Sequence, residues 1–534
     1  MSLQFIIGSS GSGKSCYAYQ NIIEQAGLHP EKLFFVIVPE QFTMQTQKTL
    51  VEMSPGKGIL NIDILSFERL AYRVLEEVGG DSRTLLEETG KSMVLQKMVQ
   101  QHGKELSYLG GQMRKAGYLD EVKSILSEFM QYDIRDSEIQ EMIEDSSDRA
   151  LLQMKLKDVS VLYQAFIGYL KDHYMTGEEV MDALEKALPF SKKMKNSVLL
   201  LDGYTGFTPI QMRVVGELLA VCEKVMVTVT MDATENLSTR GKPYQLFYMS
   251  RQMIHGLSEL TRDIEESILL KDVRKSRFSQ APALHFLEKN IFRYRKNVYK
   301  KKQDEICMFS ATSPLKEMEE TARRIARLVR EKDCRYGEIA VITGNLEEYG
   351  NLAKQVFTAA GIPYFIDEKH TVLMNPFVEY FRAALEMAVQ DFSYESVFRY
   401  LRCGMSCVTR EEADLLENYV LALGIRGFKK WDEVWVRIYR GMPPESIQRL
   451  NEIRERFADE TRELALSFKG GKKTVREYCT ILYEFALKSQ VQQKLKHQEL
   501  KFKEQGDKAM EKEYAQIYGI VMELLDNMVE ILGE

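Results

Sequence analysis

Short apolar runs alternate with amphipathic segments over the first fifty residues. Residues 3–7 form one apolar run and residues 33–38 another, while a helical pattern begins at Lys14 and returns over residues 43–52. Apolar runs of four to eight residues joined by helical segments are typical of parallel strands with crossover helices. The chain is therefore predicted to open as a parallel α/β domain.

This pattern is interrupted between residues 79 and 195. There, apolar residues recur at the spacing of one helix face, as in Tyr118, Val122, Ile125, Leu126 and Phe129. The α/β pattern returns with a strand at residues 198–201, a helix over 209–221 and a strand over 225–230. We therefore predict a first domain made of residues 1–78 and 196–285, with a helical insertion over 79–195.

A second α/β pattern follows a polar, basic stretch at residues 271–302. Its predicted strands are 306–310, 339–343 and 364–367, and its predicted helices are 315–331 and 347–360. From residue 375 the pattern is helical. Residues 303–374 are thus predicted to start a second α/β domain, and 375–534 to form a second helical insertion, which leaves the second domain incomplete.

Composition narrows the class of protein. A chain of 534 residues, 45% hydrophobic and 28% charged, is expected to fold into about three or four compact units. The net charge of −6 provides no overall basic field, so a nucleic-acid site would have to be a local groove. Seven scattered cysteines and the lack of a signal peptide or long apolar run predict a cytoplasmic protein without a membrane span.

The first motif with chemistry lies between the first strand and the first helix. It fits the phosphate-binding pattern G-x-x-x-x-G-K-[ST] and consists of Gly8, Ser9, Ser10, Gly11, Ser12, Gly13, Lys14 and Ser15. Backbone N–H groups of such a loop cradle phosphates, the lysine reaches the β and γ phosphates, and the serine hydroxyl ligates Mg²⁺. A flexible glycine–serine turn is the alternative.

A second candidate site is an acidic residue that follows a strand with the apolar composition of a buried strand. Residues 198–201 end at Asp202, which is placed to hold Mg²⁺ together with Ser15, usually through water. Active members of the helicase superfamily carry a water-activating glutamate at the next position, where this chain has Gly203. No other catalytic residue is assigned, and we expect ATP binding with little or no hydrolysis. An ordinary strand-end acid or helix cap is the alternative for Asp202.

Several segments resemble the AddB subunit of bacterial AddAB helicase–nucleases. They are the phosphate loop with its preceding strand and residues 38–43, 64–71, 202–209 and 335–342. The resemblance covers essentially the whole chain and implies a P-loop NTPase of the superfamily-one helicase type, with two RecA-like parallel-sheet domains that each carry a helical insertion.

The resemblance also implies a role in DNA repair. Family members act in a heterodimeric ATP-dependent helicase/exodeoxyribonuclease that processes double-strand breaks for recombination. In that complex AddB is a degenerate motor, which acts as a scaffold and as the DNA-scanning arm that reads a recombination hotspot. AddA, its partner, is the active helicase. The family's 4Fe–4S cluster belongs to a C-terminal nuclease that is not visible in this sequence, so we expect no DNA cleavage by this chain alone.

The resemblance places single-stranded DNA over the loops after residues 38 and 65. The side chains expected to contact DNA are Gln41, Thr43, Phe67, Arg69, Tyr72 and Phe207. Core packing is the alternative for Phe67 and Tyr72, and a solvated loop is the alternative for Gln41 and Arg69. The basic and aromatic residues of 292–302 could also hold a phosphate backbone, although a solvated linker is favoured there.

Two further groups are interpreted as structural. Arg323, Arg324, Arg327 and Arg330 share a helix face with nearby glutamates, which favours an exposed salt-bridged face. Cys403 and Cys407 lie one helical turn apart without a second pair, which favours packing over a metal site. An active ATPase motor and an unrelated P-loop phosphotransferase remain the competing functions.

Overall fold

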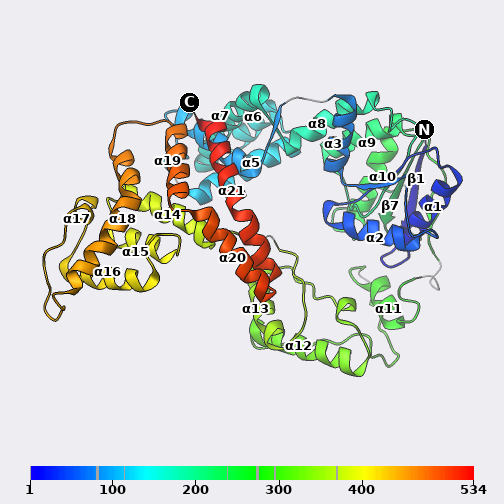
Figure 1. Ribbon diagram of the computed structural model, residues 1–534. Helices are drawn as coiled ribbons and strands as arrows, with labels where there is room; N and C mark the ends of the chain where they lie inside the picture. Colours follow the sequence, from blue (N-terminus) through cyan, green and yellow to red (C-terminus); the bar gives the residue numbers. More distant parts are fainter. Residues whose placement is uncertain are drawn as a thin grey trace. The chain divides into compact units, whose positions relative to one another are not determined.

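The computed structural model describes residues 2–79, 83–113, 115–236, 239–271, 276–293, 296–368 and 371–533. The chain divides into two compact units, Met1–Cys307 and Met308–Glu534. Each is described by itself (Figure 1).

Unit 1 is built on a parallel sheet. Within the described residues it has six strands in the order β3-β2-β6-β7-β1-β8. The strands are β1 (Ser2–Gly8), β2 (Phe34–Ile37), β3 (Ile62–Leu65), β6 (Val198–Leu201), β7 (Lys224–Thr230) and β8 (Ile268–Leu269). Ile37 pairs with both Leu65 and Leu201, and Gly8 pairs with Thr230. The carboxyl ends of the strands therefore meet at one edge of the sheet.

Helices cover both faces of this sheet (Figure 1). Alternate residues of β1 face opposite cores, because Ile6 packs into one and Phe5 and Ile7 into the other. The core around Ile6 is covered by α1 (Lys14–Leu28) and α2 (Thr43–Met53); the other is covered by α3 (Phe67–Val78), α8 (Gly177–Ala187), α9 (Pro209–Val221) and α10 (Tyr248–Leu260). The predicted parallel α/β architecture is confirmed for this unit.

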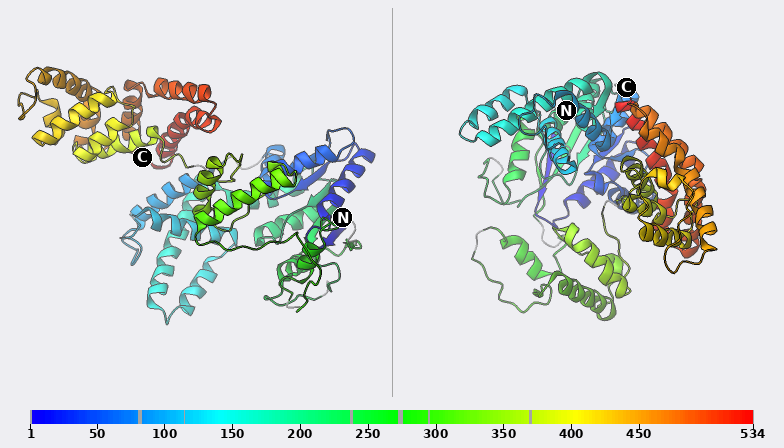
Figure 2. Two further views of the ribbon diagram at one scale, coloured as in Figure 1. Left: turned by 90° about the horizontal axis from the view of Figure 1, so that it is seen from below. Right: turned by 90° about the vertical axis from the view of Figure 1, so that its left-hand side faces the viewer.

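The segment predicted as a helical insertion is largely helical. Its helices are α4 (Glu88–His102), α5 (Ala116–Gln131), α6 (Asp136–Asp145) and α7 (Ala150–His173), drawn in blue to cyan in Figure 2. Two details differ from the prediction. The three-residue strands β4 (Thr84–Leu86) and β5 (Tyr174–Thr176) pair in parallel. They were not predicted, because strands this short leave no alternation of apolar and polar residues in the sequence. In addition, α8 packs on α3 and α9 as part of the main core.

The second predicted α/β pattern is formed only in its helices. Unit 2 begins with α12 (Pro314–Glu331) and α13 (Leu346–Ala359), which pack on each other through Ile325 and Phe357. Within its described residues, the predicted segments 306–310, 339–343 and 364–367 form no paired strand. A strand needs a neighbouring strand for its backbone groups, and among the described residues no strand pairs with these segments. A second RecA-like sheet is therefore not present in the described part of the chain.

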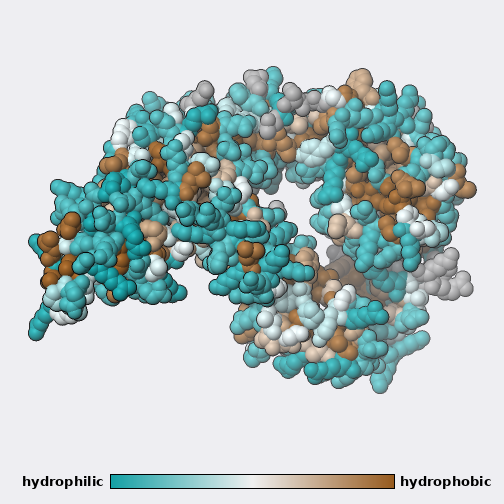
Figure 3. Space-filling model, in the orientation of Figure 1, coloured by the Kyte–Doolittle hydropathy of each residue, from teal (hydrophilic) through white to brown (hydrophobic). Residues whose placement is uncertain are grey.

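The rest of unit 2 is helical, as predicted. Its helices are α14 (Pro376–Val389), α15 (Tyr394–Arg402), α16 (Arg410–Leu423), α17 (Phe428–Asp432), α18 (Ser446–Lys469), α19 (Val475–Lys488), α20 (Val491–Gln505) and α21 (Lys508–Leu532). Their shared core is rich in aromatic side chains, including Tyr380, Trp431 and Phe457. Among the residues that the structure describes, no helix is both long and apolar enough to cross a bilayer. The face seen in Figure 3 is largely hydrophilic.

Candidate functional site

The phosphate loop connects the end of β1 to the start of α1. Gly11 and Gly13 have φ angles of +74° and +89°, a region that side-chain-bearing residues rarely adopt. Gly13 is the N-cap of α1, so the loop amides and the positive end of the helix dipole face the same site. The predicted glycines are thus required by the turn itself.

Two further features of the loop fit a phosphate group. A Cβ added to Gly8 would lie 2.3 Å from Ser12 Oγ, so residue 8 has no room for a side chain. Ser12 Oγ is buried and has no hydrogen-bond partner among the described residues. A buried hydroxyl is normally paired, and a phosphate oxygen would supply the missing partner.

Lys14 is the first residue of α1 and points back over the loop. Its Nζ donates a hydrogen bond to the backbone oxygen of Ser9 at 3.0 Å. Burial lowers the pKa of Lys14, while the negative charges of Asp202 and Glu288 act in the opposite direction. A buried ammonium group held among anionic charges suits a triphosphate ligand.

Asp202 follows β6 and is buried within a network of hydroxyl groups. Its carboxylate accepts hydrogen bonds from Ser15 Oγ at 3.1 Å, Thr228 Oγ1 at 2.5 Å and Tyr19 OH at 2.6 Å. Burial and the nearby Asp202 raise the pKa of Tyr19, so the phenol remains a proton donor. The structure therefore brings the two predicted Mg²⁺-side residues together.

Tyr19 and Thr228 belong to this network but were not predicted. Tyr19 OH also lies 3.4 Å from Thr46 Oγ1, which links α1 to α2. For Tyr19, the sequence signal that could have indicated this role is a hydroxyl-bearing side chain on the buried face of a helix, where an apolar residue would otherwise pack. Thr228 is the corresponding hydroxyl on a buried strand, β7.

The donor set suits an ion that also binds phosphate oxygens. Ser15 and Asp202 supply oxygen ligands, and Mg²⁺ generally takes one or two protein ligands plus phosphates and waters. The described residues contain no cluster of three or more histidine, cysteine, aspartate or glutamate side chains for a metal held by protein alone. These residues thus fit a nucleotide-borne magnesium ion.

Gly203 comes directly after Asp202 and has a φ of +82°. A Cβ at this position would be 3.5 Å from Pro39 Cδ, an ordinary contact. Space therefore does not exclude a side chain there, but the backbone conformation disfavours one.

The predicted DNA-contacting segments lie at the same edge of the sheet. Gln41 is exposed in a short 3₁₀ helix, Glu40–Phe42, that directly follows the β2 loop. Thr43 is buried instead, and its hydroxyl donates to the backbone oxygen of Glu40 at 2.9 Å. Of these two candidates, only Gln41 has a solvent-exposed side chain that a ligand could reach.

Two of the three aromatic candidates, Phe67 and Phe207, pack against each other, while Tyr72 does not join them. Phe67 is buried, and its ring centroid lies 5.5 Å from that of Tyr204 and 6.1 Å from that of Phe207. The alternative of core packing therefore describes Phe67, while Phe207 is half-buried at the edge of the same cluster. Tyr72 is exposed and its hydroxyl donates to Glu68 at 3.4 Å.

Arg69 occupies an exposed site with an acidic neighbour. Its guanidinium lies 3.0 Å from the Glu40 carboxylate, and both side chains are more than half exposed. An exposed pair of this kind contributes little stability, so a phosphate group could replace Glu40 at small cost. Arg69 thus joins the loop after β3 to the loop after β2.

Three of the other basic candidates are paired with carboxylates. Arg293 is bound by Glu288 and Asp232, and Arg323 and Arg324 pair with Glu320 as predicted for a salt-bridged face. Tyr294 and Arg295 of the 292–302 stretch lie outside the described residues. Arg293, Arg323 and Arg324 are therefore less available to a DNA phosphate than an unpaired side chain would be.

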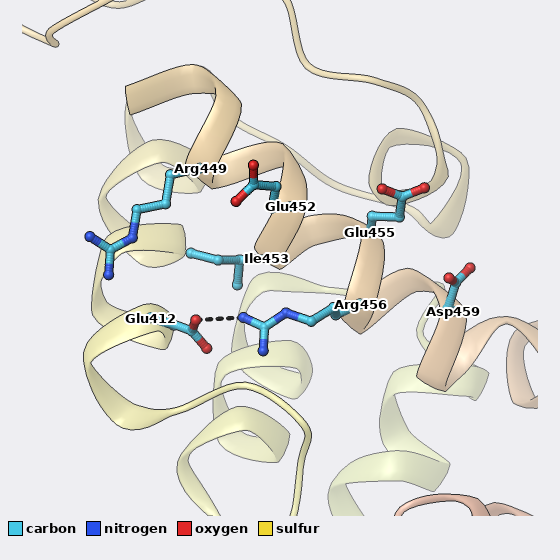
Figure 4. Close-up of a pocket in the computed structure, with 7 residues that line it drawn as sticks. All are labelled: Glu412, Arg449, Glu452, Ile453, Glu455, Arg456 and Asp459. Atoms are coloured by element: carbon cyan, nitrogen blue, oxygen red, sulfur yellow. Dashed lines mark hydrogen bonds and ion pairs between the residues drawn. The ribbon is translucent and has the colours of Figure 1, made fainter. Parts of the chain in front are cut away.

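Unit 2 contains a surface hollow between α16 and α18 (Figure 4). It is lined by Glu412, Arg449, Glu452, Ile453, Glu455, Arg456 and Asp459. Arg456 pairs with Glu412 across it, while the remaining carboxylates point in different directions. The charged side chains around the hollow do not point toward a common centre, so the hollow is not interpreted as a binding site. Nearby, Cys403 and Cys407 are free thiols whose pKa is raised to about 12 by burial.

The chain is similar to known proteins over its whole length. The family model described as "ADDB, N-terminal" matches residues 5–288. A protein from Lachnoclostridium phytofermentans, named as the B-type subunit of an ATP-dependent helicase/deoxyribonuclease, is 41% identical over the entire chain. Proteins of the same name from Caldanaerobacter subterraneus and Clostridium novyi are 34% and 33% identical.

The chain spans about half the length of these curated relatives, 47% in each case. The matched region includes the phosphate loop, Asp202 and the sheet-edge loops. The chain therefore belongs to the AddB family of ATP-dependent helicase/deoxyribonuclease subunits.

Proposed function

We propose that this chain is the nucleotide-binding and DNA-binding, helicase-like part of an AddB protein. In this proposal it works beside an AddA-like subunit in an ATP-dependent helicase/exodeoxyribonuclease that processes DNA double-strand breaks for recombinational repair. Within that complex it is a degenerate motor, a scaffold and hotspot-scanning arm. The names of its relatives and the geometry of the sheet edge support this role.

The observation that carries the nucleotide-binding part is the Ser15–Asp202 contact beneath the phosphate loop. Ser12 Oγ, Lys14 Nζ and the loop amides would bind the phosphates, and Ser15 with Asp202 would hold Mg²⁺. When bound, the ion neutralises phosphate charge. The grouping of these residues at one loop supports the proposal that the loop binds a triphosphate.

Gly203 supports the further proposal that ATP is bound without motor turnover. A glutamate at this position would have to adopt a φ near +82°, and glycine provides no carboxylate to orient an attacking water. Asp202 accepts hydrogen bonds from three hydroxyl groups and is assigned to the Mg²⁺ side of the site, so it is not proposed as the group that orients the water. ATP then acts as a ligand that sets the state of the phosphate loop.

The test of this proposal is a parallel assay of ATP binding and ATP hydrolysis by the purified chain. We expect Mg²⁺-dependent binding of a labelled ATP and negligible phosphate release, with or without single-stranded DNA. Rapid, DNA-stimulated release would assign the chain to the active motors. Absence of binding would show that the loop keeps the phosphate-binding motif without binding ATP.

The DNA part of the proposal rests on the loops that follow β2 and β3. Gln41 is exposed there, and Arg69 is paired only with an exposed glutamate. Side-chain amides and guanidinium groups at such positions hold phosphates and base edges. Phe67, which is buried, would act by supporting the loop from beneath and not by stacking on bases.

Replacing Gln41 with alanine is expected to weaken binding of single-stranded DNA about threefold, the value of one hydrogen bond. Gln47→Ala is the matched control, because Gln47 is an exposed glutamine on the adjoining helix α2. Fluorescence anisotropy with a labelled oligonucleotide measures both. Equal effects of the two substitutions would argue against the loop after β2 as a DNA contact.

A further inference from the structure

One segment of unit 1 lies against the phosphate loop and has no role in the site described above. It comprises residues 276–293, called the strap here, and includes α11 (Pro282–Asn290) (Figure 1). The strap contacts the loop at Gly11 and carries Glu288, whose negative charge acts on Lys14. Both approaches involve residues that the proposed nucleotide site needs.

The first contact closes over Gly11. The backbone N–H of Arg277 donates to the backbone oxygen of Gly11 at 2.8 Å. The ring of Phe278 lies so close that a Cβ on Gly11 would be 2.8 Å from its Cε2 atom. The middle of the phosphate loop is thus held by a hydrogen bond and covered by an aromatic ring.

The strap is fixed on both sides of this contact. Ser276 Oγ accepts a hydrogen bond from the Phe278 N–H at 3.1 Å, which shapes the turn that presents the ring. Beyond the turn, the Ala281 N–H donates to the backbone oxygen of Phe278, and the Ala283 N–H donates to the Glu305 carboxylate, both at 3.0 Å. The position of Phe278 over the loop is therefore determined by its surroundings.

The second approach is electrostatic. Glu288 on α11 is one of the two carboxylates whose charge acts on Lys14, the other being Asp202. Arg293 holds Glu288 in place through its carboxylate at 3.3 Å and also through its backbone oxygen. The same guanidinium lies 3.9 Å from Asp232, just after β7, and 5.3 Å from the ring centroid of Phe247. Glu288 is thus linked through Arg293 to residues of the main domain.

We propose that the strap is a self-inhibitory cover of the phosphate loop, which the triphosphate of an incoming nucleotide has to release. This inference rests on the proposed nucleotide binding. The triphosphate and Glu288 are both anionic, so the negative charge of Glu288 disfavours binding of a triphosphate at Lys14. Phe278 and Arg277 meanwhile hold Gly11 and resist adjustment of the loop around a ligand.

The test compares nucleotide affinity in the full chain and in two strap variants. Glu288→Gln removes the competing charge yet keeps an oxygen for Arg293, and it is expected to tighten binding of a Mg²⁺-bound ATP analogue about fivefold. Phe278→Ala uncovers Gly11 and is expected to act in the same direction. The matched control is Glu266→Gln, which makes the same charge change at an exposed residue that precedes the strap. Unchanged or weaker affinity in both strap variants would overturn the proposal.

Hydrogen exchange of the peptide containing residues 276–281 separates this inference from nucleotide binding itself. Without nucleotide, the Arg277 amide is expected to be protected, and Phe278→Ala should remove that protection. Addition of the Mg²⁺-bound analogue should speed exchange in the unmodified chain. An unprotected peptide in the free chain would contradict the strap proposal and leave the proposed nucleotide binding unaffected. Protection with no nucleotide binding by either variant would instead refute the nucleotide site, and the self-inhibitory cover along with it.

Discussion

Replacing Lys14 with alanine is expected to weaken binding of Mg²⁺-bound ATP by about 100-fold or more, the value of a charge-assisted contact to phosphate. The side chain lies directly over the loop, with a single hydrogen bond to the backbone oxygen of Ser9. Phosphate oxygens would replace that neutral acceptor with charged ones. Titration with a fluorescent ATP analogue measures the change.

The fold is expected to survive this substitution. Loss of the bond to Ser9 should change the free energy of unfolding by no more than about 1 kcal/mol. Lys48→Ala provides the control, because Lys48 is exposed on α2 and its acidic neighbour Glu52 is 3.9 Å away. If both lysine variants bind the analogue as well as the unmodified chain, the phosphate loop does not bind ATP.

Replacing Asp202 with alanine is expected to lower the stability of unit 1 by about 3 kcal/mol and to abolish the effect of Mg²⁺ on nucleotide affinity. The stability loss follows because Ser15, Tyr19 and Thr228 all donate to this buried carboxylate. Urea unfolding followed by circular dichroism measures it. The two tryptophans, Trp431 and Trp435, both lie in unit 2, so their fluorescence serves as an internal reference.

Asp202→Asn separates the two effects. Asparagine keeps the volume and one acceptor oxygen, so the stability loss should be clearly smaller than that of the alanine variant. The charge that attracts Mg²⁺ is absent in both, and neither should respond to the ion. A normal magnesium dependence in the asparagine variant would exclude Asp202 from the metal site.

The sequence was most informative where structure is determined locally. β1, the glycines of the loop and α1 follow from an apolar run, a motif and a helical pattern that adjoin one another. The meeting of Ser15 and Asp202, 187 residues apart, was also predictable, because parallel strands bring their carboxyl ends to one edge. Motif and topology together were sufficient there.

Prediction failed where a feature depends on a distant partner. Segment 339–343 has the composition of a strand, yet composition cannot provide the neighbouring strand that its backbone needs. Phe278 stands in a polar stretch without a motif, so nothing local indicated its contact with Gly11. Arg69 was predicted as a DNA contact, and its pairing with Glu40 depends on how two loops meet.

The position of β1 in the sheet has a consequence for synthesis of the chain. β1 is made first, but its neighbours β7 and β8 begin at Lys224 and Ile268. More than two hundred residues must therefore leave the ribosome before the first strand can pair, which gives this domain a high contact order. Until then an apolar segment and its phosphate loop remain without a sheet. The proposed nucleotide site is thus assembled late in synthesis, only after Thr230 has been added.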